Sequence, residues 1–152
     1  MTSKLAVSLF ALFILLSMAV YFLVNPSYEK SLRAKYYYEI GDYRESYTLA
    51  KEAFDIDLYN RMASTIMTQS QISLKYVGYI EDAKKYMKEI DTIALHKNLT
   101  DADRAKIKMI CHIMLGSYVK LAPSVITNET LVAEAQEQYK KFEKLFEKVN
   151  KK

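Results

Sequence analysis

The sequence predicts an all-α protein in which one membrane-spanning helix precedes a helical domain. Glycine and proline are scarce, with 3 and 2 residues in a chain of 152, and this is too few for the many turns of a sandwich or barrel. Hydrophobic residues make up 51% of the chain and charged residues 26%, so the composition is typical of a folded domain. The apolar periodicity indicates about six helices, arranged as antiparallel hairpins.

The first element is an apolar segment from Leu5 to Val24 that contains no charged residue. A helix of this length, at about 1.5 Å per residue, is about 30 Å long and matches the hydrocarbon core of a bilayer. Asn25 and Pro26 would end the helix where the chain enters water. We therefore expect residues 1–25 to form a transmembrane anchor and residues 26–152 to form a helical domain.

The apolar segment has one alternative interpretation, and its orientation has another. A cleaved signal peptide would have its cleavage site at residues 17–19, but cleavage there would leave an apolar start on the mature chain, which favours the anchor. Basic residues are Lys4 on one side and Lys30, Arg33 and Lys35 on the other. Basic residues tend to stay on the cytoplasmic side of a membrane, so their larger number after the apolar segment favours a single-pass protein with its helical domain in the cytoplasm. A domain in the periplasm or in a lumen is the alternative.

A helical hairpin is expected next, with its turn at residues 41–43. Gly41 permits the chain reversal, and small residues let the two helices approach closely. The small positions are Ala34, Ser46, Ala50 and Ala53, and Tyr37 fills the space that they leave. This pattern resembles a tetratricopeptide repeat, a family built from paired antiparallel helices. The resemblance implies that residues 26–152 form a tetratricopeptide-like domain.

Further helices follow the first hairpin. A second hairpin is expected from Asn60 to Ala94 with its turn at Gly78, because a glycine recurs there 37 residues after Gly41. Thr100 and Asp103 form the pattern of a capping box, which opens a helix to about residue 121, before Pro123. A last helix is expected from residue 128 to residue 149, where apolar residues recur at spacings of three and four.

No catalytic, metal-binding or cofactor-binding pattern is present in the sequence. Cys111 and His112 are adjacent on a helix and point about 100° apart, so they cannot face one substrate together, and burial of Cys111 is expected. His96 is the only other histidine, and no Cys or His pair has the spacing of metal ligands. No phosphate-binding glycine loop and no basic cluster for nucleic acid is present. We expect neither an enzyme nor a cofactor.

The resemblance also implies where a partner would bind, because the first helix of each tetratricopeptide hairpin lines a groove that holds a peptide. The implied residues are Tyr28, Lys35, Tyr38 and Glu39 from the first hairpin, and Arg61, Thr65, Gln69 and Ser73 from the second. The last four recur every four residues as a polar stripe, and plain solvent exposure is the alternative interpretation.

The last helix has an apolar seam formed by Leu131, Phe142, Phe146 and Val149. We expect this seam to cover the last hairpin, as the capping helices of repeat proteins do, and homodimerisation through it is the alternative.

These expectations favour a membrane-anchored adaptor or assembly chaperone that binds a protein partner at a membrane complex of the secretion, envelope or flagellar-motor kind. Tethering raises the local concentration, so a modest affinity suffices. The alternative is a structural subunit of a membrane complex that assembles through its transmembrane helix.

Overall fold

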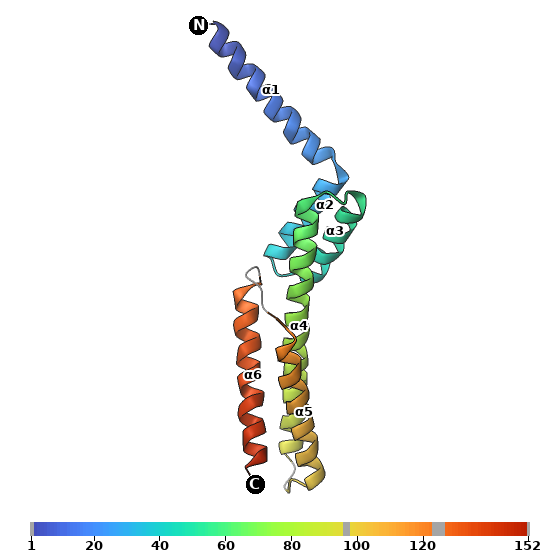
Figure 1. Ribbon diagram of the computed structural model, residues 1–152, viewed down its shortest axis with the longest axis vertical. Coiled ribbons are helices and arrows are strands. Elements are labelled where there is room, and N and C mark those ends of the chain that lie inside the picture. The colour runs from blue at the N-terminus through green and yellow to red at the C-terminus, as the bar shows by residue number, and fades with distance from the viewer. Residues whose placement is uncertain (1, 96–97, 123–126, 152) are drawn as a thin grey trace. The chain divides into compact units, whose positions relative to one another are not determined.

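The computed structural model describes residues 2–95, 98–122 and 127–151, and these residues form six helices with no strand among them (Figure 1). The helices are α1 (Thr2–Val24), α2 (Pro26–Glu39), α3 (Tyr43–Ile56), α4 (Arg61–Ala94), α5 (Asp101–Val119) and α6 (Glu129–Asn150). The all-α prediction is confirmed. The chain divides into two compact units, Met1–Gln71 and Ile72–Lys152, and the following paragraphs describe each unit by itself.

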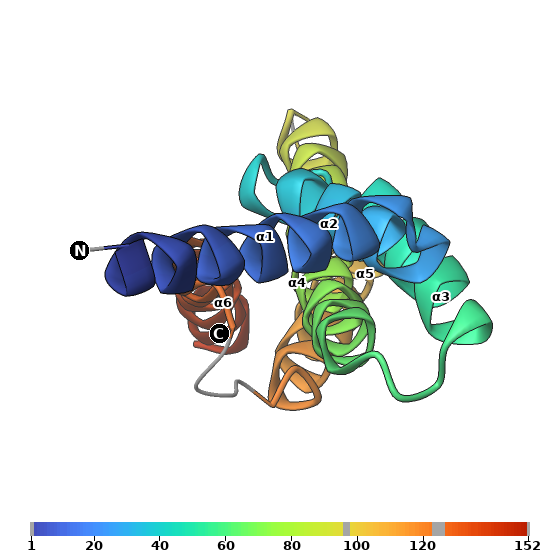
Figure 2. The same ribbon diagram turned by 90° about the horizontal axis from the view of Figure 1, so that it is seen from above.

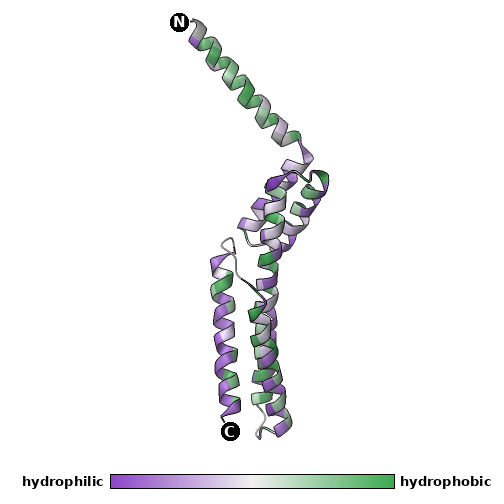
Figure 3. Ribbon diagram, viewed as in Figure 1, coloured by the Kyte–Doolittle hydropathy of each residue, from purple (hydrophilic) through white to green (hydrophobic). Residues whose placement is uncertain are grey.

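The N-terminal helix α1 is apolar along most of its length (Figure 3). Its window Lys4–Tyr21 comprises 18 residues with a mean hydropathy of 2.1, and none of this window is buried against the rest of the protein. Such a helix is long and apolar enough to cross a membrane, and a signal sequence has the same length and composition. Asn25 interrupts the helical path, and its side chain accepts a hydrogen bond from the backbone N–H of Ser27 at 3.0 Å.

Helices α2 and α3 of the first unit form the expected antiparallel hairpin (Figure 2). Gly41 adopts a φ of 85°, a conformation that an L side chain rarely takes, and the chain reverses there. Asp42 then caps α3 by accepting a hydrogen bond from the backbone N–H of Glu45 at 3.1 Å. All four predicted small positions are completely buried, which allows the close approach of the two helices.

The expected turn at Gly78 does not exist, and the second hairpin is a wrong prediction. Helix α4 is a single helix of 34 residues that passes through Gly78 without interruption. Tyr76, Tyr79, Ile80 and Ala83 follow the helical period around this glycine and are all buried. A glycine inside a helix costs about 1 kcal/mol relative to alanine, and the burial of these side chains exceeds that cost.

The second unit packs the later part of α4, α5 and α6 around one core. Helix α5 runs antiparallel to α4, and α6 runs antiparallel to α5 (Figure 1). The capping box predicted for α5 is confirmed, since Thr100 and Asp103 bond reciprocally, and α6 begins after its N-cap Asn128 as expected. Buried residues from all three helices form the core, among them Tyr76, Ile80, Ile110, Met114 and Phe142.

Two residues singled out in the sequence, His96 and Pro123, lie outside the described residues.

Candidate partner-binding site

The first unit contains a surface pocket between α2 and the start of α4, with a volume of about 440 Å³. We call it the α2–α4 pocket. It is lined by Lys35, Tyr38 and Glu39 from α2 and by Arg61, Met62, Thr65, Ile66 and Gln69 from α4. The α2 residues follow the three- and four-residue spacing of one helix face, and so do the residues of α4.

Buried hydrogen bonds fix the start of α4 against α2. The side-chain amide of Asn60 donates to the hydroxyl oxygens of Ser27 and Ser31, each at 2.8 Å, and all three residues are buried. The carbonyl oxygen of the same amide accepts from the backbone N–H of Ala63 at 3.1 Å. Asn60 therefore caps α4 and bonds to α2 at the same time, which sets the position of one wall of the pocket relative to the other.

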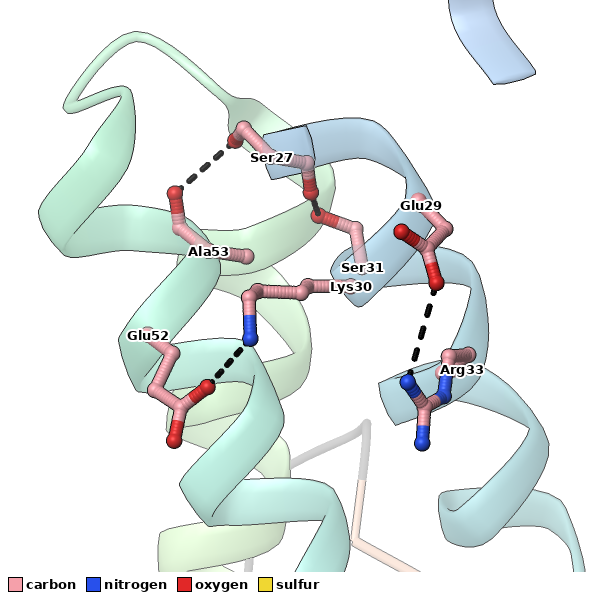
Figure 4. Close-up of polar contacts among 7 residues, drawn as sticks. All are labelled: Ser27, Glu29, Lys30, Ser31, Arg33, Glu52 and Ala53. Carbon is pink, nitrogen blue, oxygen red and sulfur yellow. Dashed lines mark hydrogen bonds and ion pairs between the residues drawn. The ribbon is translucent and has the colours of Figure 1, made fainter. Parts of the chain in front are cut away.

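Helix α2 is also held to α3, by a buried hydrogen bond and by an ion pair (Figure 4). The hydroxyl of Ser27 donates to the backbone carbonyl of Ala53 at 2.8 Å, inside the hairpin. On the exposed side, Lys30 forms an ion pair with Glu52. Exposed ion pairs contribute at most about 1 kcal/mol, so the buried hydroxyl contacts have the larger role in positioning α2.

The pocket combines an apolar floor with charged sides. Ile66 is buried in a small core with Ala34, Leu49 and Ala50, and Met62 packs against this core from the pocket side. Tyr38 is half-buried, and its ring meets the ring of Tyr43 edge to face, with 5.3 Å between the centroids. The floor is therefore part of the packed unit rather than a mobile surface.

Three charged side chains at the pocket have no ion-pair partner among the described residues. They are Lys35, Glu39 and Arg61, and all three are exposed. No ion pair within the described residues engages these charges, so they are available to groups of opposite charge on a ligand.

Six of the eight residues predicted to bind a partner line this pocket, and two do not. Tyr28 is half-buried in the first turn of α2 and is not part of the pocket lining. Ser73 is completely buried, so its assignment to an exposed polar stripe is wrong. Four residues turn a helix by about 400°, so a four-residue spacing drifts by about 40° at each step. At Ser73 the accumulated rotation places the side chain on the buried face of α4.

Sequence reasoning missed Met62 and Ile66, which form the floor of the pocket. They lie four residues apart and so share one face of α4, and this apolar i, i+4 spacing was the available signal.

The groups that might carry other chemistry do not converge in the described part of the chain. Cys111 is completely buried, as expected, and burial raises the pKa of its thiol, whereas His112 is exposed. Within residues 2–95, 98–122 and 127–151, no group of three or more His, Cys, Asp or Glu side chains is arranged to hold a metal ion.

The apolar seam of α6 packs against the core of the second unit. Phe142 is completely buried there, and Leu131, Phe146 and Val149 are half-buried against the same cluster. The intramolecular arrangement expected for this seam is thus present. The alternative, homodimerisation through this seam, stays a prediction.

Compared with protein-family models, curated proteins and solved structures, the chain matches none of them.

Proposed function

We propose that this protein is a membrane-anchored adaptor or assembly chaperone with a tetratricopeptide-like hairpin, which holds a protein partner at a membrane complex. The α2–α4 pocket is the observation that supports this function most. Residues from two helices converge there on an apolar floor, beside charges without partners within the described chain. A pocket of about 440 Å³ is within the range that holds a small ligand or a few side chains of a peptide.

The tetratricopeptide resemblance is supported by the hairpin of α2 and α3. The turn falls at Gly41, and the expected small residues are buried between the two helices. Helix α4, which passes through Gly78, departs from the repeat pattern. The resemblance is therefore supported over α2 and α3, and α2 lines the pocket together with the start of α4.

The pocket suits a peptide segment with one apolar side chain flanked by charged residues of both signs. The apolar side chain would lie on Met62 and Ile66, and the flanking charges would pair with Lys35, Arg61 or Glu39. Burial of one large apolar side chain contributes about 1.5 to 3 kcal/mol, which alone gives weak binding. An anchor in the same membrane as the partner raises the effective concentration enough for such affinities to suffice.

The length and composition of α1 support the anchor. Its 18-residue apolar window lacks any buried residue, so the helix contributes no core to the domain. An unburied apolar helix of this length is expected to lie in a bilayer, where its surface is covered by lipid.

Affinity capture from solubilised membranes tests the proposed site. Thr65 is exposed and lines the pocket, and Thr68 is exposed on the same helix outside it. We expect Thr65→Arg to fill the pocket and to lose partners that wild type and the matched control Thr68→Arg both retain. Circular dichroism should show the same helicity for all three proteins. If all three capture the same proteins at the same yield, the pocket does not bind the partner.

The alternative, a structural subunit that assembles through α1, is favoured by the exposure of its window Lys4–Tyr21, none of which is buried within the chain. Replacing residues 5–24 with an unrelated spanning helix separates the two functions. Partner capture that survives the replacement supports the adaptor, and loss of assembly with a normally folded domain supports the structural subunit.

A further inference from the structure

The second unit has a surface of its own that the proposed function does not use. A pocket of about 360 Å³ lies between α4 and α5, and we call it the α4–α5 pocket. Lys75, Gly78 and Asp82 line it from α4, and Ile113 lines it from α5. These residues all belong to the second unit, so this pocket is separate from the α2–α4 pocket.

Gly78 leaves the surface of α4 bare at the middle of this face. A Cβ atom added at Gly78 would have no heavy atom within 4 Å, so the space above the helix is open. The helical backbone does not require a glycine here, because Gly78 lacks the positive φ of Gly41. A large side chain at this position would keep another helix at a distance, whereas glycine allows its backbone to approach closely.

An apolar side chain lies beside the bare helix surface. Ile113 is 45% exposed although it lines the pocket, and Met109, one turn earlier on α5, is 58% exposed. Covering these side chains would remove apolar surface from water, at about 25 cal/mol per Å². The face therefore offers hydrophobic contact as well as close approach.

Two opposite charges flank Gly78 on the same helix face. Lys75 lies three residues before it and Asp82 lies four residues after it, and both are exposed. Neither has an ion-pair partner within the described ranges of the chain. The two charges are seven residues apart, which is two helical turns or about 10 Å, so they cannot neutralise each other.

We propose that this face binds the same face of a second copy of the protein. In an isologous dimer the two α4 helices cross antiparallel, with the twofold axis close to Gly78. Lys75 of each copy then lies opposite Asp82 of the other copy, because the axis falls midway between the two positions. The occupant is a second copy because its identical face, turned by the twofold axis, supplies the required charges in reverse order.

A charge swap in the full-length protein, solubilised in detergent, tests this pairing. Lys75→Glu places two carboxylates against each other at both pairs, and Asp82→Lys does the same with two ammonium groups. Each single variant should weaken dimerisation about tenfold or more, and the double variant Lys75→Glu/Asp82→Lys should restore it. The readout is the dimer dissociation constant from sedimentation equilibrium. Restoration cannot arise from a purely structural effect of either residue.

Disulfide formation in membranes provides a second, independent readout. Gly78→Cys places a thiol next to its twin at the axis, and a disulfide spans the short distance between two closely packed backbones. Within a single copy the added Cβ meets no heavy atom within 4 Å, so the fold of each copy is kept. Lys88→Cys is the matched control, since Lys88 is exposed on α4 outside the pocket. With a mild oxidant, which accepts the two electrons released as the S–S bond forms, Gly78→Cys should cross-link and Lys88→Cys should not.

The results that would overturn the dimer are equally specific. The proposal fails if the double charge variant dimerises no better than the single variants. It also fails if all the charge variants show the same average molecular mass as wild type in sedimentation equilibrium. It also fails if Gly78→Cys yields no more cross-link than Lys88→Cys. Binding of a different protein on this face would appear as cross-links to that protein in place of the homodimer. None of these variants touches the α2–α4 pocket, so partner capture should be unchanged.

Discussion

The hydroxyl oxygens of Ser46 and Ser70 lie 2.8 Å apart, and both side chains are completely buried. Ser46 donates its single hydroxyl proton to the backbone carbonyl of Ala34, also at 2.8 Å, so Ser70 must be the donor to Ser46. This chain of two hydrogen bonds joins α4, α3 and α2 inside the first unit. This polar contact therefore joins α2 and α4, the two helices that line the α2–α4 pocket, to α3.

Removing one member of this pair should cost more than removing both. Ser46→Ala leaves the buried hydroxyl of Ser70 without its acceptor, and we expect a loss of about 1 to 3 kcal/mol in the stability of the first unit. The double variant Ser46→Ala/Ser70→Ala leaves no orphaned hydroxyl and should be close to wild type. Amide hydrogen exchange of α2 and α3 measures this difference, and a double variant that is less stable than Ser46→Ala would contradict it.

Overpacking the α2–α3 contact should open the hairpin. Ala53 is completely buried, and its backbone carbonyl accepts the hydroxyl of Ser27. Ala53→Phe should destabilise the first unit by about 1 to 3 kcal/mol, because the two helices cannot separate to make room without losing that hydrogen bond. Lys51→Phe, at an exposed position on the same helix, is the control. Equal protection of α2 amides in both variants would refute the close packing.

Stability should fall between pH 10 and pH 12 because of Tyr79. Its hydroxyl is buried without a hydrogen-bond partner among the described residues, and burial, with Tyr118 and Tyr139 nearby, raises its pKa from 10.0 to about 12. Below pH 10 the folded and unfolded chains both keep the proton. Above it the unfolded chain loses the proton first, so the free energy of unfolding decreases as pH rises through this window.

Two tyrosine variants test the role of this hydroxyl. Tyr79→Phe should reduce the alkaline loss and should not destabilise the protein at neutral pH, since an unpartnered buried hydroxyl contributes no hydrogen bond. Tyr59→Phe, at a position that is 93% exposed, should keep the full alkaline loss. Chemical denaturation at several pH values gives the measurement. A clear loss of stability in Tyr79→Phe at neutral pH would reveal a partner for the hydroxyl.

The α1 helix should hold the protein in membranes by hydrophobic contact. We expect the full-length protein to stay in the membrane fraction after washes with high salt and with alkaline carbonate, because a span of this length is not an electrostatic attachment. A variant without residues 1–25 should appear in the supernatant and remain helical by circular dichroism. Carbonate release of the intact chain would show that α1 does not span the bilayer.

The sequence allowed the turn at Gly41 to be predicted correctly and the turn at Gly78 to be predicted wrongly, and the residue after each glycine explains the difference. Asp42 follows Gly41 and caps the next helix through its side chain. Tyr79 follows Gly78, has no capping group, and continues the buried face of α4. A glycine becomes a helix terminus when a cap follows it, and apolar periodicity on both sides favours a continuous helix.

The residues that line the α2–α4 pocket could be predicted only in part from the sequence. Lys35, Tyr38 and Glu39 follow from the helix face implied by the tetratricopeptide resemblance, and the structure brings them to one pocket with residues of α4. The assignment of Ser73 to the same surface was wrong, because residues spaced by four positions rotate gradually around a long helix. The side chain of Asn60, which sets where α4 begins, acts through contacts with Ser27 and Ser31 that lie far away in sequence and leave no local pattern.

Site-specific photo-cross-linking in intact membranes tests the central claim, that the α2–α4 pocket holds a protein partner, most directly. A photoreactive amino acid at Thr65 lies in the pocket, and the same amino acid at Thr68 lies outside it on the same helix. The adaptor function predicts a discrete cross-linked partner from position 65 that is absent from position 68. No adduct from position 65, or identical adducts from both positions, would contradict it.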